Sequence, residues 1–510
     1  MSKDDGGNIS AYTPEQVQNT GQAAKHFGRG AAWLVTMRWA TRLVGVVSTV
    51  VLARLLAPED FGVMAIAMLA VALIEVLAQS GQHMALVRHA EDTRDLYDAA
   101  WTLSVIQGLL LSLLIAASAP LAATLFDEPR VRDVILVMAL RPFLLGITNI
   151  GVVAFLKELN FGREFQFRIL EKCIGFTATI GLAILLRSYW ALVLGAIISG
   201  VGQVALSYWL HPFRPRFAVR RMREILTYSA HILTQSIMIF GTRKSDEFVV
   251  ASVSGTGAVG NYAVAGNLAS APIEELVLPM VRALHSIYSR LADKAEALRE
   301  TYLLVFGMVA TIALPAAAGI ALVAEDVVPV LLGEKWNAAI PIVRWLALMT
   351  GLSLLANTSE NLLNAVGGER RVTGLSWFRL AVLLPAVIAA GMLAGVEEMA
   401  LARCGVALVV LPFFVIAAAR STGCGPVDYL RTGWRPLLAT GAMSVVLLWM
   451  DTAIDASNTV QLISQVVAGA LVYPAVLLGS WALSGRPEGP EHYVVGLLTG
   501  RSKGTPIIEP

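Results

Sequence analysis

Residues 228–250 read YSAHILTQSIMIFGTRKSDEFVV, an apolar run of helical length that ends in a cluster of charges. Four charged side chains fall within five positions, at Arg243, Lys244, Asp246 and Glu247, and no turn signal separates them from the apolar part. In lipid, each ionisable side chain costs about 2.5–3.5 kcal/mol on insertion scales and must face a bundle interior or water. The interpretation of this stretch therefore depends on whether the chain lies in a membrane or in water.

The composition indicates that the chain lies in a membrane. The 510 residues are 56% hydrophobic and 15% charged, with a mean hydropathy of +0.66, whereas a soluble domain carries about 25% charged residues. Apolar runs near the ~20 residues that a spanning helix needs recur along the whole chain. We therefore predict an all-α polytopic membrane protein, and the net charge of +2 gives no sign of nucleic-acid binding.

The apolar windows predict fourteen transmembrane helices. They fall near 31–53, 61–80, 99–124, 134–155, 169–186, 189–210, 225–252, 257–284, 301–323, 339–363, 373–395, 398–419, 434–450 and 460–483. The window at 434–450 is the shortest.

Lysine and arginine in the short loops predict the orientation. With the N-terminus in the cytoplasm, one side collects nearly all loop cations, and the other side holds only Arg130, Arg132, Arg187 and Lys335. Since positive charge marks the cytoplasmic side, both termini are expected there. The first 29 residues are polar, without the apolar stretch of a cleavable signal.

The chain also repeats itself at a shift of 198 residues. VVLARLLAPEDFGVMAIA (50–67) matches VVASVSGTGAVGNYAVA (249–265), with Gly62 over Gly260 and Ala65 over Ala263. Both stretches end one span and start the next, so spans one to six and seven to twelve are predicted to be two six-helix lobes related by a parallel repeat. Chance similarity between helices rich in small residues is the alternative.

The repeat divides the chain into six expected regions. They are a polar tail (1–29), a first lobe (30–211), a basic linker (212–224), a second lobe (225–421), two extra C-terminal spans (434–484) and a second tail (485–510). No connection between the spans is long enough for a catalytic domain, and no G-x-x-x-x-G-K-[ST] phosphate loop occurs. Cys173, Cys404 and Cys424 show no metal-site spacing, so we expect a channel or secondary transporter without a metal or cofactor, and not an enzyme.

The first predicted span carries a cationic stripe. Arg38, Arg42, Gly45 and Thr49 are spaced to share one helical face, and Arg54 lies near the outward end. Guanidinium groups bind phosphate bidentately, so these arginines are candidates for attracting an anionic substrate. The alternative for Arg38 is that its side chain reaches to the cytoplasmic interface.

The seventh and eighth spans carry further ionisable groups. A polar stripe of His231, Gln235, Thr242 and Asp246 suggests a water-filled cavity between the lobes, and we expect Arg243 to pair with Asp246 or Glu247 along the helix. A purely structural ion-pair cluster is the alternative. In span eight, Pro272 can break or kink the helix just before Glu274 and Glu275, which become candidates for cation or proton binding. Pairing of such a carboxylate with an arginine of another helix is an equal alternative. Other polar residues extend the predicted lining: Glu75, Gln79, Arg141, Asn357, Glu360, Asn361 and Asn364.

Four segments together resemble bacterial polysaccharide-repeat-unit flippases. They are LARLLAPEDFGVMAIA (52–67), FLKELNFGREFQFR (155–168), residues 260–302, and LLGEKWNAAIPIVRWLAL (331–348), and they follow the family order over most of 30–420. The chain is most similar to the subgroup that exports units of the colanic-acid and succinoglycan type. Lys157 departs from the arginine usual in that family.

The resemblance implies a 14-helix fold of the multidrug/oligosaccharidyl-lipid/polysaccharide exporter superfamily in the bacterial inner membrane. It also implies transfer of undecaprenyl-pyrophosphate-linked oligosaccharides to the periplasmic leaflet for surface polysaccharide synthesis, driven by a gradient of H⁺ or Na⁺. The polysaccharide polymerase and export machinery would be partners. Arg38, Arg42, Arg54 and Arg243 would attract phosphate. Asp246, Glu274, Glu275 and Glu75 would bind the coupling ion or balance charge, and Thr49, Gln235, Thr242, Glu360 and Asn361 would complete the polar cavity.

Other functions remain open from the sequence. A lipid II flippase and a cation-coupled multidrug exporter would share the fold, although an exporter of organic cations should favour acidic and aromatic cavity residues over arginines. A scramblase without ion coupling is a further alternative. A membrane glycosyltransferase is disfavoured because it needs a larger extracytoplasmic loop.

Overall fold

The computed structural model describes residues 39–77, 94–157, 160–218, 230–453, 457–487 and 489–492. These residues are almost entirely helical and contain no strand, which confirms the predicted all-α polytopic fold. Among them, nine helices are long and apolar enough to cross a membrane.

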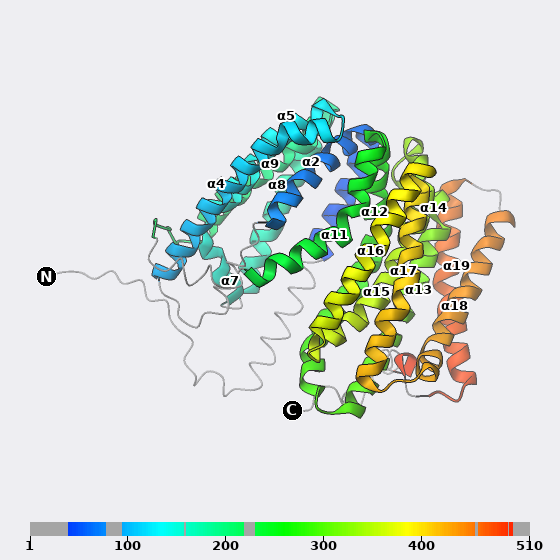
Figure 1. Cartoon of the computed structure of the whole chain (residues 1–510). Helices are drawn as coiled ribbons and strands as arrows, with labels where there is room; N and C mark the ends of the chain where they lie inside the picture. Colours follow the sequence, from blue (N-terminus) through cyan, green and yellow to red (C-terminus); the bar gives the residue numbers. More distant parts are fainter. Residues whose placement is uncertain are drawn as a thin grey trace.

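The first half of the chain forms one helical bundle (Figure 1). Its first helix covers residues 39–55 of the described chain. It continues with α2 (Pro58–Leu77), α4 (Arg94–Leu125), α5 (Pro129–Met138), α6 (Leu140–Gly146), η2 (Ile150–Val152), α7 (Val153–Lys157), α8 (Phe161–Leu186) and α9 (Trp190–Leu210).

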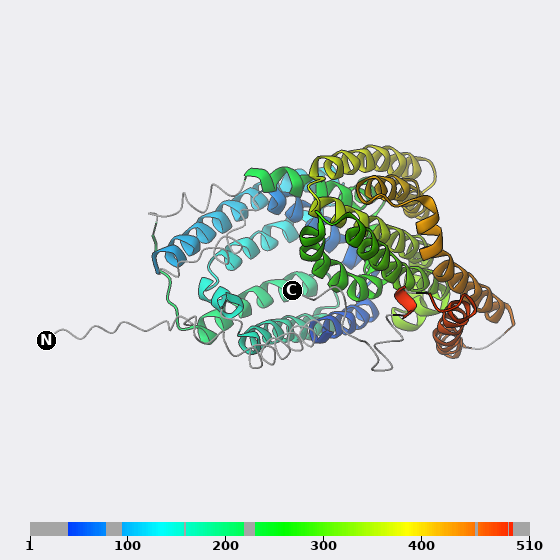
Figure 2. The same ribbon diagram turned by 90° about the horizontal axis from the view of Figure 1, so that it is seen from below.

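The second half forms another bundle. Its helices are α11 (Ala230–Val253), α12 (Thr256–Leu291), α13 (Ala295–Leu322), α14 (Ala324–Leu331), η3 (Glu334–Ala339), α15 (Ile340–Ala365), α16 (Glu369–Leu393) and α17 (Val396–Thr422). Helices α18 (Pro426–Ala453) and α19 (Asn458–Leu483) pack on α13 and α14, on the outer side of this bundle (Figures 1 and 2). The short window at 434–450 is thus part of a 28-residue helix.

Span four breaks where a continuous helix is predicted, and the break expected at Pro272 is absent, while a kink there stays a prediction. Span four is divided into α5, α6, η2 and α7, because Pro142 has no N–H to donate to the preceding turn and Asn149 is extended where it caps η2. Span eight, by contrast, is one unbroken 36-residue helix through Pro272. Helix α12 packs along α2, α13 and α15, and this packing supports the turn at Pro272, where one backbone hydrogen bond is missing.

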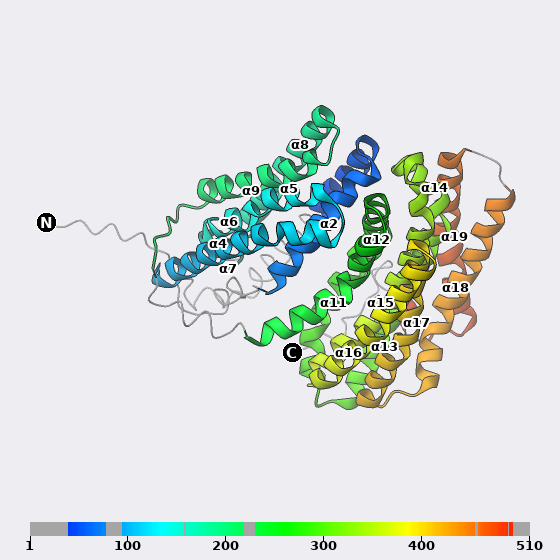
Figure 3. The same ribbon diagram turned by 45° about the horizontal axis from the view of Figure 1, so that its top comes forward.

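The two bundles meet at one end and diverge toward the other (Figures 1 and 3). We call the end with the turns near residues 56, 127, 254 and 333 the joined end, and the opposite end the splayed end. The largest apolar core contains residues of both halves, such as Val63 and Val259. Two other cores each belong to a single half, one around Trp101 and one around Tyr302. Within the ranges that the structure describes, the halves therefore share their packed interior toward the joined end.

The start of the predicted linker is bound to the first half. Residues 211–218, here called the strap, follow α9 without helical structure. The Arg216 amide donates to Asp98 Oδ1 at 2.8 Å, and the Ala218 amide donates to the Thr102 hydroxyl at 2.9 Å. The remaining linker residues lie outside the described chain, and the limits of the six predicted regions stay a prediction.

Candidate functional site

One ion pair connects the two halves inside the apolar region. Arg42 of the first helix and Glu275 of α12 approach with 4.0 Å between Nε and Oε1, and their side chains are 34% and 22% exposed. Because the contact is long and both side chains are partly exposed, neither side chain is locked into it. The structure thus brings together one of the predicted phosphate-attracting arginines and one of the predicted ion-coupling carboxylates.

A second pair of this loose kind lies within the first half. Arg141 on α6 and Glu75 on α2 approach with 3.9 Å between Nη1 and Oε1, and both side chains are about one-third exposed. Arg141 directly precedes Pro142 on the broken fourth span, and the break places α6 beside α4 and α9.

The second half contains a denser set of charges. Arg379 of α16 and Glu360 of α15 are 3.9 Å apart between Nη1 and Oε2. Arg243 on α11 lies close enough to both residues, and to Arg403, to act on them electrostatically. The Arg243 side chain is exposed, and no carboxylate of the described chain forms an ion pair with it. This cluster therefore has an excess of cationic groups that an anion can approach.

Asp246 is held differently from its neighbours on α11. Its carboxylate pairs with Arg403 of α17 and accepts a 2.6 Å hydrogen bond from the Tyr262 hydroxyl of α12. The side chains of Asp246 and Arg403 are 1% and 15% exposed. This pair joins three helices in the interior, where a lone charge would be very costly.

The predicted pairing of Arg243 along its own helix is wrong. Asp246 binds Arg403, and Glu247 binds the Lys244 ammonium at 2.5 and 2.7 Å. The tertiary contact prevails because Arg403, only 15% exposed on α17, requires a counter-charge. Arg243, already exposed, does not.

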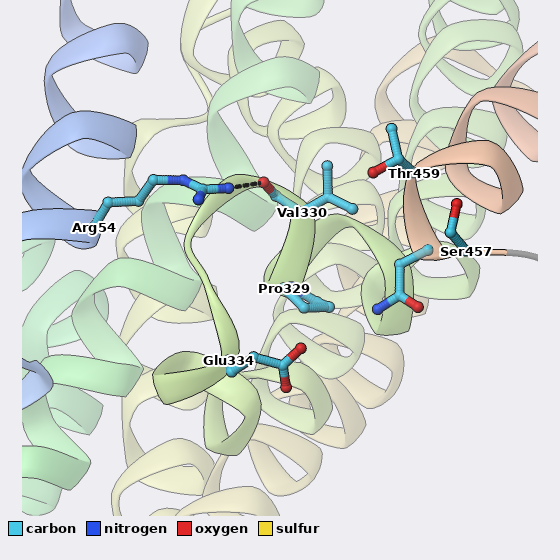
Figure 4. Close-up of a pocket in the computed structure, with 7 residues that line it drawn as sticks. Arg54, Pro329, Val330, Glu334, Ser457 and Thr459 are labelled. Atoms are coloured by element: carbon cyan, nitrogen blue, oxygen red, sulfur yellow. Dashed lines mark hydrogen bonds between the residues drawn. The ribbon is translucent and has the colours of Figure 1, made fainter.

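Arg54 lies away from the other candidate arginines. It is twelve residues beyond Arg42, roughly 18 Å along the helix at 1.5 Å per residue. Its guanidinium donates to the Val330 carbonyl (Figure 4) and also to the Leu331 carbonyl, at the joined end. It borders a pocket of about 390 Å³ with Pro329, Glu334 and Thr459. The structure therefore does not bring Arg54 together with Arg42 or Arg243.

The smaller polar candidates make local contacts. Thr49 donates to the Gly45 carbonyl at 3.1 Å, and Asn361 donates to the Asn357 carbonyl at 2.7 Å. Thr242 and Glu274 are half-buried. Arg38 lies outside the described residues, and the side chains of His231 and Gln235 are not described.

Sequence reasoning missed Arg379, Arg403 and Tyr262. Both arginines interrupt predicted spans, in LSWFRLAV and MALARCGV. The rule that selected Arg42 would therefore have found them. Tyr262 had no such signal, because its role depends on α11 and α12 lying side by side. In the part of the chain that the structure describes, no group of three His, Cys, Asp or Glu side chains is arranged to hold a metal ion.

The fold and the paired intramembrane charges define a polytopic membrane transporter of two bundles. Residues 51–341, more than half of the chain, match the family described as "Polysaccharide biosynthesis protein". The chain belongs to this family, which confirms the resemblance seen in its motifs.

Curated relatives match along most of their length. The chain is 24% identical over 435 residues to "Lipopolysaccharide biosynthesis protein WzxC" of Escherichia coli (strain K12), covering 82% of this chain and 87% of the relative. It is 24% identical over 464 residues to "Succinoglycan biosynthesis transport protein ExoT" of Rhizobium meliloti (strain 1021), covering 89% and 93%.

Solved structures show the same fold at low identity. An inward closed structure of the lipid II flippase MurJ superposes with a TM-score of 0.66 at 12% identity, covering 88% of this chain and 99% of that one. An inward-facing multidrug transporter of the MATE family gives a TM-score of 0.55 at 16% identity, covering 77% and 99%.

Proposed function

We propose that this protein moves undecaprenyl-pyrophosphate-linked oligosaccharide repeat units from the cytoplasmic to the periplasmic leaflet by alternating access, for surface polysaccharide synthesis. The family assignment and the names of WzxC and ExoT support polysaccharide biosynthesis as the setting and transport as the task. The fold, shared with MurJ and a MATE transporter, supports two lobes that rock against each other.

The observation that carries this proposal is the loose Arg42–Glu275 pair between the halves. A pyrophosphate group offers more acceptor oxygens and more negative charge than a carboxylate, so it can displace Glu275 from the Arg42 guanidinium. Because Glu275 remains nearby at 4.0 Å, it can take Arg42 back once the substrate leaves. Such an exchange allows binding and release without leaving an arginine unpaired.

Arg243 and Arg379 are proposed as the matching cations of the second half. Arg243 has no ion pair within the described chain, and Arg379 is held by Glu360 across 3.9 Å. A substrate group that contacts Arg42 on one lobe and Arg243 on the other bridges both lobes. The sugars need only a hydrated path, while the polyprenyl chain stays in lipid.

The positive charges of the loops support a cytoplasmic orientation for the splayed end of this conformation. They assign the splayed end to the cytoplasm, so the described state would take up substrate from the cytoplasmic leaflet. Glu274, Glu275 and Glu75 remain the candidates for H⁺ or Na⁺ coupling. The Asp246–Arg403 pair favours a structural role for Asp246. The polysaccharide polymerase and export machinery are proposed as partners only because the chain belongs to a polysaccharide biosynthesis family.

Mass spectrometry of undecaprenyl-linked oligosaccharides in cells lacking the gene tests the proposal. We expect single repeat units to accumulate and surface polysaccharide to be lost, with both defects corrected by the wild-type gene. Arg42→Gln should reduce export roughly tenfold, which corresponds to about 1.4 kcal/mol, and Arg42→Lys should retain part of it because the charge remains.

A matched control uses Arg344, which pairs with Glu325 at 2.6 Å. Arg344→Gln removes an arginine from another span, α15, and should leave export unchanged. An unchanged lipid-linked pool in the deletion strain would reject flipping. If the strain instead became sensitive to organic cations, multidrug export would be the better conclusion.

A further inference from the structure

The carbonyls that end the first helix are occupied by donors from the other half of the chain. The last carbonyls of a helix have no partner within it, and here Trp336 Nε1 donates to the Ala53 carbonyl at 2.9 Å. Lys335 Nζ donates to the carbonyls of Arg54 and Leu56 at 3.1 and 2.5 Å. A cation at a helix C-terminus also complements the helix dipole.

The same relationship holds in the opposite direction. Arg54, at the end of the first helix, donates through Nη2 to the carbonyl of Val330 (Figure 4) and through Nε to the carbonyl of Leu331. These are the last two carbonyls of α14, and the two before them accept from the amides of Leu332 and Gly333. Each half therefore completes the hydrogen bonding of a helix end in the other half.

The turn between α14 and η3 positions these donors. Gly333 adopts φ +99°, a left-handed conformation that favours glycine. The turn lets the chain reverse so that Trp336 is fully buried, with its ring edge-on to Phe61 of α2 at 5.2 Å. The charged groups of Arg54 and Lys335 remain on exposed side chains. Water can therefore replace the bonds of Arg54 and Lys335 when the halves separate, whereas carbonyls that stayed buried would lose their partners at a high cost.

The corresponding contact on the other side of the joined end is apolar. Phe126, in the turn before α5, meets Phe248 of α11 with ring centres 5.4 Å apart. A contact between two aromatic rings contains no hydrogen bonds that could be exchanged for bonds to water. The polar contact is therefore the one suited to act as a switch.

We propose that Arg54, Lys335 and Trp336 form an inter-half latch that keeps the joined end closed and must open for the lobes to rock. The latch gives the transport cycle its outer gate, and this step rests on the proposed alternating-access function. It also assigns Arg54 to gating, in place of phosphate binding.

Spin-label distances in the purified full-length protein in lipid nanodiscs test the latch. Labels at Leu186, the last residue of α8, and at Asn337 of η3 lie on exposed positions in different halves. We expect a predominantly short distance in the otherwise wild-type protein. Arg54→Leu and Lys335→Met should each raise the ratio of long to short distances roughly tenfold, equivalent to about 1.4 kcal/mol.

Arg132→Leu is the matched control, because it removes an exposed arginine of α5 outside the latch. Its distance distribution should match the wild type. Unchanged distributions in both Arg54→Leu and Lys335→Met would overturn the latch. The outcome is separate from flipping: a distance response together with an unchanged lipid-linked pool in the deletion strain would support the latch and reject the proposed substrate.

Discussion

Gly62 and Gly260 lie against each other where α2 crosses α12. A Cβ atom on Gly62 would overlap the Thr256 carbonyl, and one on Gly260 would overlap the Pro58 carbonyl. Thr256 follows Pro58 by 198 residues, since 256 − 58 = 198, and Gly260 follows Gly62 by the same shift. The contact is thus reciprocal, as expected if the axis that relates the two repeats passes through it. Backbones this close leave room only for glycine.

Alanine at either glycine should therefore destabilise the protein. In a free helix, glycine to alanine stabilises by about 0.5–1 kcal/mol, but here the added methyl meets backbone oxygen, which cannot rotate away as a flexible side chain can. We expect Gly62→Ala and Gly260→Ala each to cost about 1–3 kcal/mol, as overpacking does. Thermal unfolding in detergent measures the change.

Gly181 provides the control for this substitution. It lies within α8, and a Cβ there would meet nothing within 4 Å. Gly181→Ala should leave stability unchanged or slightly raised. Equal melting temperatures for all three variants would show that the α2–α12 crossing tolerates a methyl group.

Removing one partner of the Asp246–Arg403 pair should destabilise the protein much more than removing both partners. Asp246→Ala leaves the Arg403 guanidinium without its counter-charge in the interior, which costs about 3–5 kcal/mol for a buried pair. The Asp246→Ala/Arg403→Met double variant removes both charges and should recover most of that loss. Chemical unfolding of the purified protein measures each step.

Transport by the double variant then separates two roles for Asp246. A stable double variant that restores surface polysaccharide in the deletion strain assigns the pair to structure. One that folds but exports nothing assigns Asp246 to ion coupling, contrary to our expectation.

Much of the fold could be predicted from the sequence because membrane helices follow a local rule. Apolar length alone located both ends of α19 within two residues and the C-terminal end of α8, whereas α8 begins eight residues before its predicted start, since 169 − 161 = 8. The rule failed at the fourth span, where Pro142 and Asn149 divide an apolar window that composition shows as continuous. A different rule, that proline can break a helix, failed at Pro272, where neighbouring helices keep α12 continuous.

The candidate site was predicted less completely, because the ion-pair partners of its charged residues lie on helices that are distant in the sequence. Sequence spacing identified Arg42 and Glu275 separately, but their contact depends on how the halves meet. Spacing also favoured pairs along α11, and the actual partner of Asp246 lies on α17, 157 residues away since 403 − 246 = 157. Local rules cannot rank such a partner against a neighbour on the same helix.

His211 predicts a pH dependence of the strap. The Phe213 amide donates to His211 Nδ1 at 3.1 Å, which requires that nitrogen to be unprotonated. Burial, and then the nearby Arg163 and Arg214, lower the pKa of His211 below its ordinary value of 6.5. The folded state thus binds the proton less readily than the unfolded chain. This contribution to stability is fully present above about pH 6.5 and is lost as the pH falls through the lowered pKa.

Hydrogen exchange of residues 211–218, corrected for the intrinsic rate at each pH, measures this effect. Protection should decrease below pH 6.5 in the wild type. His211→Asn places a non-titrating oxygen near the position of Nδ1 and should keep protection constant over the same range. A wild-type strap that is equally protected at pH 7.5 and 5 would remove His211 from this role.

Asn149 should tolerate alanine better than aspartate. The side chain is fully buried, and its Nδ2 faces the carbonyls of Phe213, His211 and Ser207 at 2.8, 3.3 and 3.4 Å. Its Oδ1 accepts from the Gly151 amide at 2.9 Å. Alanine leaves these groups unsatisfied at a cost of about 1–3 kcal/mol. Aspartate keeps the acceptor but turns a second oxygen toward the carbonyls, so it should cost more.

Thermal unfolding of Asn149→Ala and Asn149→Asp tests this order, with Asn267→Asp as the control. Asn267 is exposed, and its amide donates to the carbonyl of Ala263, one turn earlier in the same helix. Aspartate there should cost less than at Asn149, because the exposed Asn267 amide contacts one carbonyl and not three. If Asn149→Asp were as stable as the wild type, the three carbonyls would not depend on the amide, and the break in the fourth span would need another explanation.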